Sequence, residues 1–165
     1  MSDPGNRRGT LAAQPPAQGE EDLVLFVRTG RLPEQPIRDF ARILCHRVAG
    51  GRTFLCLVAD DRELHRLNRR FLGKDYPTDV LSFPSGEAPA SASLGEIAIS
   101  VNRAMSQALE LGYPALTEIQ ILMLHGLLHL LGMDHETDSG EMARAEARWR
   151  KRLNLPAGLI ERARV

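Results

Sequence analysis

The sequence has little cysteine, no long apolar segment and no excess of charge of either sign. Its two cysteines, Cys45 and Cys56, lie in apolar segments and lack the paired spacing of a metal or redox motif, so we expect buried free thiols in a reducing compartment. No run of residues is apolar and long enough to cross a membrane, and Arg7 and Arg8 are not followed by the hydrophobic region of a signal peptide. The sequence therefore predicts a cytoplasmic protein without membrane association.

The charge balance and the aromatic content also restrict how the chain could bind nucleic acid. Basic and acidic residues number 21 each, so RNA binding would need a local basic patch and not a global field. Basic residues do cluster at 66–74 and at 144–152, although a solvated helix face is the commoner meaning of such runs. Aromatic residues make up only 5% of the chain, so single-stranded bases would stack on a few rings such as Tyr76 or Phe83.

Three of the five histidines lie within HGLLHLLGMDH, at residues 125–135. His125 and His129 are four residues apart in an apolar run that predicts a helix, which puts both imidazoles on one face, about 6 Å apart along the axis. Gly132 permits a left-handed end to that helix, and the turned chain can then deliver His135. Three nitrogen ligands leave one open position on a tetrahedral zinc ion, which is typical of a catalytic site. We therefore predict one Zn2+ ion bound by His125, His129 and His135, and we favour this over three unrelated histidines.

The same spacing matches the zinc-protease motif H-E-x-x-H-x-x-G-x-x-H at its histidines and its glycine. The glutamate that serves those proteases as general base is here Gly126. The chain thus has the metal-binding half of the motif and lacks the proteolytic base.

The rest of the pattern predicts one domain after a short leader. Residues 1–21 are rich in glycine, proline, alanine and glutamine and have no apolar period, which predicts a disordered leader that is dispensable for the chemistry. Residues 22–165 are expected to form a single domain. The apolar periods predict strands at 22–28, 53–59, 79–83 and 94–100, and helices at 37–50, 60–72, 101–111, 116–131 and 139–153.

This order of elements indicates an α+β fold, in which one mixed β-sheet is packed with helices and the histidines lie on a helix and the turn that follows it. Asp60 or Asp61 is expected to cap the second helix, and Asp138 with Glu141 to form a capping box for the last.

A second segment, GKDYPTDVLSFP at residues 73–84, places a lysine, two aspartates, a threonine and a serine between a predicted helix and a predicted strand. Aspartate, proline and threonine all favour turns, so turn formation alone is one interpretation. The other is a functional loop that brings polar groups to a site.

Together with LGEIAIS between them, HGLLHLLGMDH and GKDYPTDVLSFP closely resemble the YbeY family, over roughly residues 55–153. The resemblance implies a single-strand-specific endoribonuclease that matures ribosomal RNA, notably the 3′ end of the small-subunit RNA, and that takes part in late ribosome quality control. It implies an α+β fold and a zinc ion on His125, His129 and His135. Its implied partners are precursor ribosomal RNA and the small ribosomal subunit, with ribosomal proteins or an assembly GTPase as further candidates.

One position departs from that family. Many members have an arginine, implicated in activity, directly before the Gly-Lys-Asp triplet, and here the position is Leu72. Arg69, Arg70 or Lys74 could supply the lost cation, and we predict Lys74 and Arg70 as catalytic residues. Asp134, beside the third histidine, is expected to orient an imidazole or to act as a base, with a turn residue as the alternative.

Asp79 and Ser82 are further candidates for contacts with the substrate. We also hypothesise that Gly126 leaves room beside the metal for a nucleotide backbone, so that Gly126→Glu would obstruct RNA cleavage. Two other functions fit the histidine pattern. One is a metallopeptidase or similar small-substrate hydrolase with another base near the metal. The other is a non-enzymatic ribosome-assembly factor whose structural zinc is closed by a fourth ligand such as His65 or an acidic residue.

Overall fold

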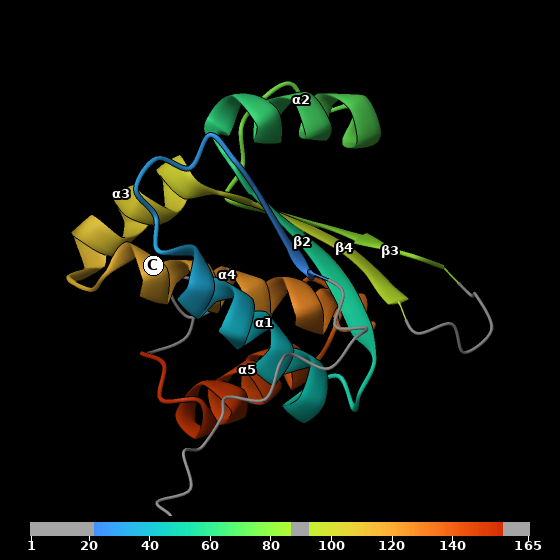
Figure 1. Ribbon diagram of the computed structural model, residues 1–165. Helices are drawn as coiled ribbons and strands as arrows, with labels where there is room; N and C mark the ends of the chain where they lie inside the picture. Colours follow the sequence, from blue (N-terminus) through green and yellow to red (C-terminus); the bar gives the residue numbers. More distant parts are fainter. Residues whose placement is uncertain (1–21, 87–92, 157–165) are drawn as a thin grey trace, which may run out of the picture.

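A four-stranded mixed sheet forms the centre of the fold (Figure 1). The computed structural model describes residues 22–86 and 93–156, so the predicted leader lies outside the described residues. The strands are β1 (Val24–Val27), β2 (Thr53–Ala59), β3 (Val80–Pro84) and β4 (Ser93–Ser100), in the spatial order β1-β2-β4-β3. β1, β2 and β4 run parallel, and β3 pairs antiparallel to β4. The predicted mixed sheet is confirmed.

Five helices accompany the sheet within the described residues: α1 (Glu34–Arg47), α2 (Asp61–Leu72), α3 (Val101–Leu111), α4 (Ala115–Leu130) and α5 (Glu141–Arg152). The predicted order of strands and helices is confirmed. α1 and α4 lie on one side of the sheet with α5 beyond them, whereas α2 lies over the opposite side (Figure 1). In the described part of the chain, no helix combines the length and the apolar character needed to span a bilayer.

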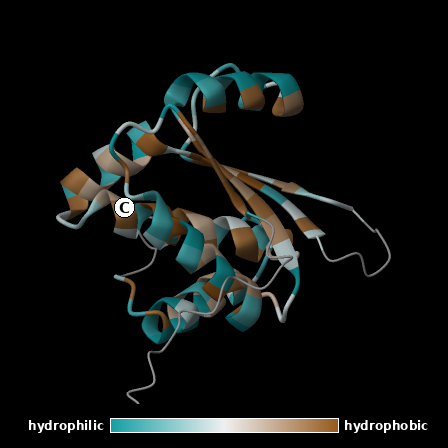
Figure 2. Cartoon of the chain, in the orientation of Figure 1, coloured by the Kyte–Doolittle hydropathy of each residue, from teal (hydrophilic) through white to brown (hydrophobic). Residues whose placement is uncertain are grey.

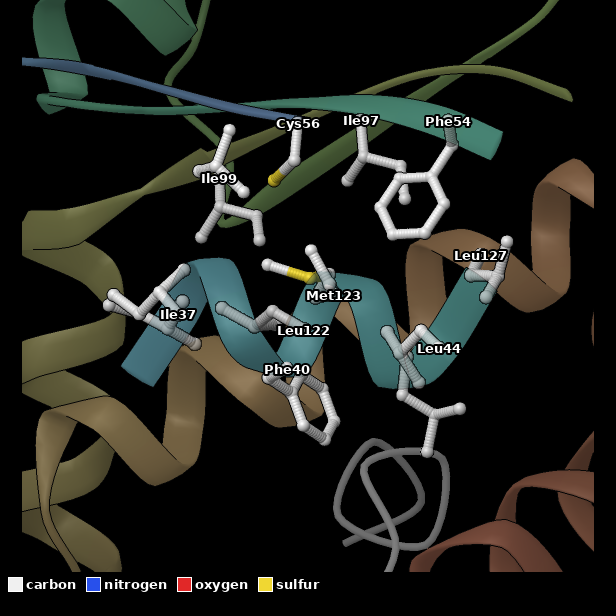
Figure 3. Packing of buried hydrophobic residues seen from close by; sticks show 14 of the residues in the cluster. Ile37, Phe40, Leu44, Phe54, Cys56, Ile97, Ile99, Leu122, Met123 and Leu127 are labelled. Carbon is white, nitrogen blue, oxygen red and sulfur yellow. The ribbon is translucent and has the colours of Figure 1, made fainter. Parts of the chain in front are cut away.

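The main core lies between the sheet and α4 (Figure 3). Phe54, Ile97 and Ile99 point from the strands toward Leu122 and Met123 of α4, and all five side chains are buried. α4 is apolar on nearly all sides and eleven of its sixteen residues are buried, as expected for a helix enclosed between a sheet and other helices. The helix that carries the first two histidines is therefore held rigidly on several faces.

α2 is different, because most of it is hydrophilic and its apolar residues lie toward the sheet (Figure 2). Asp60 is its N-cap, as predicted, and accepts a hydrogen bond of 3.1 Å from the backbone N–H of Glu63. The Arg28 guanidinium donates to the Asp60 carboxylate at 2.8 Å and lowers the pKa of Asp60. The start of α2 is thus tied to the end of β1.

Two helix starts differ from the prediction. α1 begins at Glu34 and not at residue 37, because Pro36 falls in the first turn, where a helix needs no backbone N–H donor. α5 begins at Glu141, and the predicted capping box is wrong: Gly140 is the N-cap, with a φ of 93°. Asp138 instead accepts from the N–H groups of Gly140 and Met142, both at 2.8 Å, while Glu141 accepts from Ser139. The two predicted carboxylates still hold the helix start, Asp138 from two residues before the N-cap and Glu141 from the first turn.

Candidate metal centre

The end of α4 and the turn after it bring the three predicted histidines together. His125 and His129 lie on the last turns of α4, and Gly132 follows with a φ of 92°, the left-handed conformation that reverses the chain. The N–H of Gly132 donates to the carbonyl of His129 at 3.0 Å and closes the helix. One nitrogen from each of His125, His129 and His135 lies within 4.8 Å of the others. The predicted histidine group is present.

The state of these imidazoles suits a metal ion. The Nε2 atoms of His125 and His129 face each other at 3.2 Å. Burial, followed by the neighbouring His125 and His135, lowers the pKa of His129, so the ring is neutral near pH 7, the form that binds metal. His135 Nδ1 is buried and has no hydrogen-bond partner among the described residues. Three imidazole nitrogens this close together, with Nδ1 of His135 lacking a partner among the described residues, form the donor set that a divalent transition metal takes.

A carboxylate from α5 reaches the same histidine cluster. Glu146, 1% exposed, places Oε1 3.3 Å from Nδ1 of His125. Arg150, one turn further on and 2% exposed, lies 3.6 Å from the same Glu146 oxygen. The sequence prediction did not include Glu146 or Arg150. The sequence did contain a signal for them. Glu146 and Arg150 lie one turn apart on the α5 face that also carries Met142 and Ala145, and this spacing indicates that both side chains are buried.

The histidines line a hollow of about 620 Å3, here called the metal hollow, between α2, the 73–84 loop, β3 and the end of α4. Lys74 and Asp134, two of the predicted catalytic residues, also line it, as does Leu72. Arg70 does not line the metal hollow: its guanidinium lies 5.2 Å over the ring of Phe71. The structure thus brings Lys74 and Asp134 into the metal hollow and leaves Arg70 outside it.

Asp134 also forms the turn that carries His135. Its Oδ1 accepts the backbone N–H of Glu136 at 3.0 Å, and its backbone carbonyl accepts from Asp138. Its negative charge acts on His129 in the direction that raises the pKa of that ring. The turn role expected as the alternative is therefore present, and it holds the carboxylate beside the histidines.

Two carboxylates hold the loop between α2 and β3, residues 73–79, in place. Asp75 pairs with His65 at 2.7 Å, so His65 is bound on α2 and is not part of the histidine group. Asp79 accepts from its neighbour Val80 at 2.8 Å and from Gln107 of α3 at 3.2 Å. Both carboxylates therefore anchor the ends of the loop. Lys74 forms no ion pair with any residue in 22–86 or 93–156, which leaves its ammonium group available to a ligand.

Ser82 and Gly126 form the contact between β3 and α4. The Ser82 hydroxyl donates to the backbone carbonyl of Gly126 at 3.1 Å. A Cβ at Gly126 would lie 2.8 Å from Cγ2 of Ile97, under the sheet. The expectation that Gly126 makes room for a nucleotide is wrong, because this position faces the buried side of β4. The glycine instead allows α4 to pack closely on the sheet, and the protease glutamate would not fit here.

Outside the metal hollow, α2 carries a basic surface. A shallow hollow of about 360 Å3 lies on its outer side, and we call its lining residues the α2 arginine patch: Arg62, His65, Arg66, Arg69 and Arg70. Of its arginines, only Arg66 has an ion-pair partner in the described part of the chain, Glu63. The C-terminal end of α2 lines the metal hollow through Asn68 and Leu72, so α2 contributes to both the metal hollow and the α2 arginine patch.

Comparison with known proteins was consistent across sequence and structure. The family model described as Endoribonuclease YbeY matches residues 38–154. A Solibacter usitatus protein named endoribonuclease YbeY is 54% identical over 144 residues, which cover 87% of this chain and 95% of that protein. A Helicobacter pylori protein of the same name is 44% identical over 116 residues, covering 70% and 82%. The solution structure of a Thermotoga maritima protein has a TM-score of 0.55 at 26% identity and covers 76% of this chain and 85% of its own.

Proposed function

The chain belongs to the YbeY family of endoribonucleases, and on this premise we propose that it cleaves single-stranded RNA at a zinc ion held by His125, His129 and His135. The observation that carries the proposal is the convergence of three histidine nitrogens in a hollow that also holds Lys74 and Asp134. Within the described residues the group contains three ligands and no fourth, which favours a catalytic ion over a structural one.

When bound, the ion supplies Lewis acidity toward a phosphoryl oxygen and a water molecule. The protein residues do the rest. The lowered pKa of His129 keeps that ligand neutral. The Lys74 ammonium binds the phosphate that is cut, replacing the cation missing at Leu72. The Asp134 carboxylate orients the His135 turn and accepts the proton of the attacking group.

The α2 arginine patch is proposed to hold the RNA strand beyond the cleavage point. Its guanidinium groups bind phosphates and so position the strand without reading its sequence. Arg70, predicted as catalytic, takes part here through strand binding, because it lines this patch and not the metal hollow. Tyr76, 52% exposed beside the metal hollow, is the ring on which a base can stack.

The proposed substrate is precursor ribosomal RNA, cut at the 3′ end of the small-subunit RNA in the cytoplasm, with the small ribosomal subunit, its proteins or an assembly GTPase as partners. The resemblance in the 73–84 and 125–135 segments supports this assignment. With few aromatic rings the site offers little stacking for bases, which suits an enzyme whose cleavage specificity comes from the ribosomal context.

The peptidase alternative loses support from Gly126. A Cβ at this position would point under the sheet, so a side chain here could not act as the protease base beside His125. The assembly-factor alternative loses support because His65, one of the fourth ligands considered beside an acidic residue, is paired with Asp75.

The decisive experiment compares purified wild type, His129→Ala and His46→Ala on a single-stranded precursor of the small-subunit RNA 3′ end. His46 lies exposed on α1, outside the histidine group, and serves as the matched control. We expect cleavage by wild type and by His46→Ala and none by a folded His129→Ala, with folding checked by circular dichroism. Equal cleavage by all three would show that the activity is a contaminant and refute the proposal. A 3′-hydroxyl on the product would identify water as the nucleophile, and a 2′,3′-cyclic phosphate would identify the ribose hydroxyl.

A further inference from the structure

The contact between α5 and the histidine group has a specific geometry. Glu146 accepts a hydrogen bond from Nδ1 of His125 at 3.3 Å, which puts the proton of a neutral imidazole on Nδ1. The lone pair then lies on Nε2, and Nε2 is the atom that faces His129 at 3.2 Å. One carboxylate thus fixes both the tautomer and the orientation of the most buried ligand, His125, which is 7% exposed.

The carboxylate is itself held by a buried cation. Nη2 of Arg150 lies 3.6 Å from Oε1 of Glu146, and Nη1 of Arg150 donates to the carbonyl of Pro156 at 2.5 Å. Both charged side chains are almost completely buried, so each compensates for the desolvation of the other. The chain Pro156–Arg150–Glu146–His125 connects the segment after α5 with the histidine group.

We propose that Glu146 is the positioning residue of the metal centre, with Arg150 holding it in place. By orienting His125 before the ion arrives, Glu146 raises the affinity of the three histidines for zinc. The inference rests on the proposed function for the identity of this ion. It also gives α5 a role at the site, although the helix provides no ligand.

A second buried glutamate offers a matched control. Glu118, on α4 and fully buried, accepts a hydrogen bond of 2.5 Å from the hydroxyl of Tyr113, and it is not part of the histidine group. Glu146→Gln and Glu118→Gln each replace a buried carboxylate by an amide of the same size. A merely structural role for Glu146 would make the two variants behave alike.

The first measurement is zinc affinity, by competition with a chromogenic chelator, for wild type, Glu146→Gln, Glu146→Ala and Glu118→Gln. Loss of a carboxylate that orients a metal-binding histidine weakens metal binding by about 10- to 100-fold. We expect a loss of this size in both Glu146 variants, larger in Glu146→Ala, and wild-type affinity in Glu118→Gln. Unchanged affinity in folded Glu146→Ala would overturn the proposal. If Glu146→Ala does not fold, unchanged affinity in Glu146→Gln has the same meaning.

The second measurement needs neither metal nor RNA. In 15N-histidine-labelled protein without metal, long-range 1H–15N spectra report which ring nitrogen of His125 carries the proton. We expect the Nδ1–H form in wild type and Glu118→Gln and a shift toward the Nε2–H form in Glu146→Ala. An Nε2–H form in wild type would refute the positioning role. This readout separates the two ideas, because a protein that cuts no RNA would still show the tautomer.

Discussion

The close contact between α4 and the sheet at Gly126 leads to a quantitative prediction for Gly126→Ala. The added Cβ would lie 2.8 Å from Cγ2 and 3.2 Å from Cδ1 of Ile97, and 3.2 Å from Oγ of Ser82. Ile97 is 1% exposed and enclosed in the core, so neither it nor α4 can withdraw without loss of packing. Overpacking costs about 1–3 kcal/mol, and a Cβ contact of 2.8 Å to an enclosed core carbon places this case at about 2–3 kcal/mol, of which the better helix propensity of alanine offsets about 1 kcal/mol.

We therefore expect the free energy of unfolding to fall by about 1–2 kcal/mol, which corresponds to a drop of about 2–8 °C in Tm for a chain of this size. The assay is urea unfolding of the metal-free protein, followed by circular dichroism. A second background identifies the cause. Ile97→Ala removes both clashing carbons and alone costs about 2–5 kcal/mol. Because only the 3.2 Å contact with Oγ of Ser82 then remains, adding Gly126→Ala in this background should cost clearly less than in wild type or stabilise the fold.

The reasoning would be refuted by either of two results. If Gly126→Ala is as stable as wild type, α4 does not pack on β4 as closely as the 2.8 Å contact requires. If Gly126→Ala costs the same in the wild-type and Ile97→Ala backgrounds, the loss arises elsewhere, for example in the hydrogen bond from Ser82 to the Gly126 carbonyl.

Three further properties can be measured independently. Replacing two arginines of the α2 arginine patch by glutamine should weaken the salt dependence of binding to a single-stranded RNA. The slope of log Kobs, the observed binding constant, against log salt should fall in magnitude by about 1.4 when measured by fluorescence anisotropy. An unchanged slope would mean that the strand binds elsewhere. Hydrogen bonds from the backbone of Met142 and Gly140 lower the pKa of Asp138, so its stabilising effect is complete above the ordinary carboxyl pKa and is lost as the pH falls through the lower folded value. Wild type should accordingly have a higher Tm than Asp138→Asn at pH 7 and lose this advantage in acid; a constant difference would contradict the assignment. Burial raises the pKa of Cys56 to about 12 and also raises that of Cys45, so a thiol reagent at pH 8 should modify both only after denaturation, and rapid labelling of the native protein would refute their burial.

Local patterns in the sequence predicted much of the fold. The segment 53–59 was predicted as a central strand, and β2 has these bounds and pairs with a strand on each side. The histidine group was equally accessible, because helix periodicity and one glycine bring three neighbouring histidines together without long-range contacts. Asp60 as the cap of α2 belongs to the same class of short-range signals.

The parts that the sequence did not predict depend on tertiary packing. Gly126 was expected to face the substrate because it follows the metal ligand His125 in the sequence. In the structure its Cβ position faces Ile97 of β4, which depends on how α4 packs on the sheet. Glu146 reaches His125 only because α5 packs beside α4, and no local rule fixes that docking. Asp79 directly precedes β3 and Ser82 lies within it, and only the positions of α3 and α4 show which partners their side chains bind.

The compactness of the ligand segment in the sequence has a consequence for thermal stability. His125, His129 and His135 lie within eleven consecutive residues, so an unfolded chain still carries a short, flexible chelator. An ion that binds both the native protein and the unfolded chain stabilises the fold by less than its affinity for the native protein alone suggests. The rise in Tm on adding zinc therefore reflects only the difference between the zinc affinity of the native site and that of the unfolded chain. That advantage comes from α4, the turn at Gly132 and the carboxylate of Glu146, which together distinguish the native site from the same three histidines in an unfolded peptide.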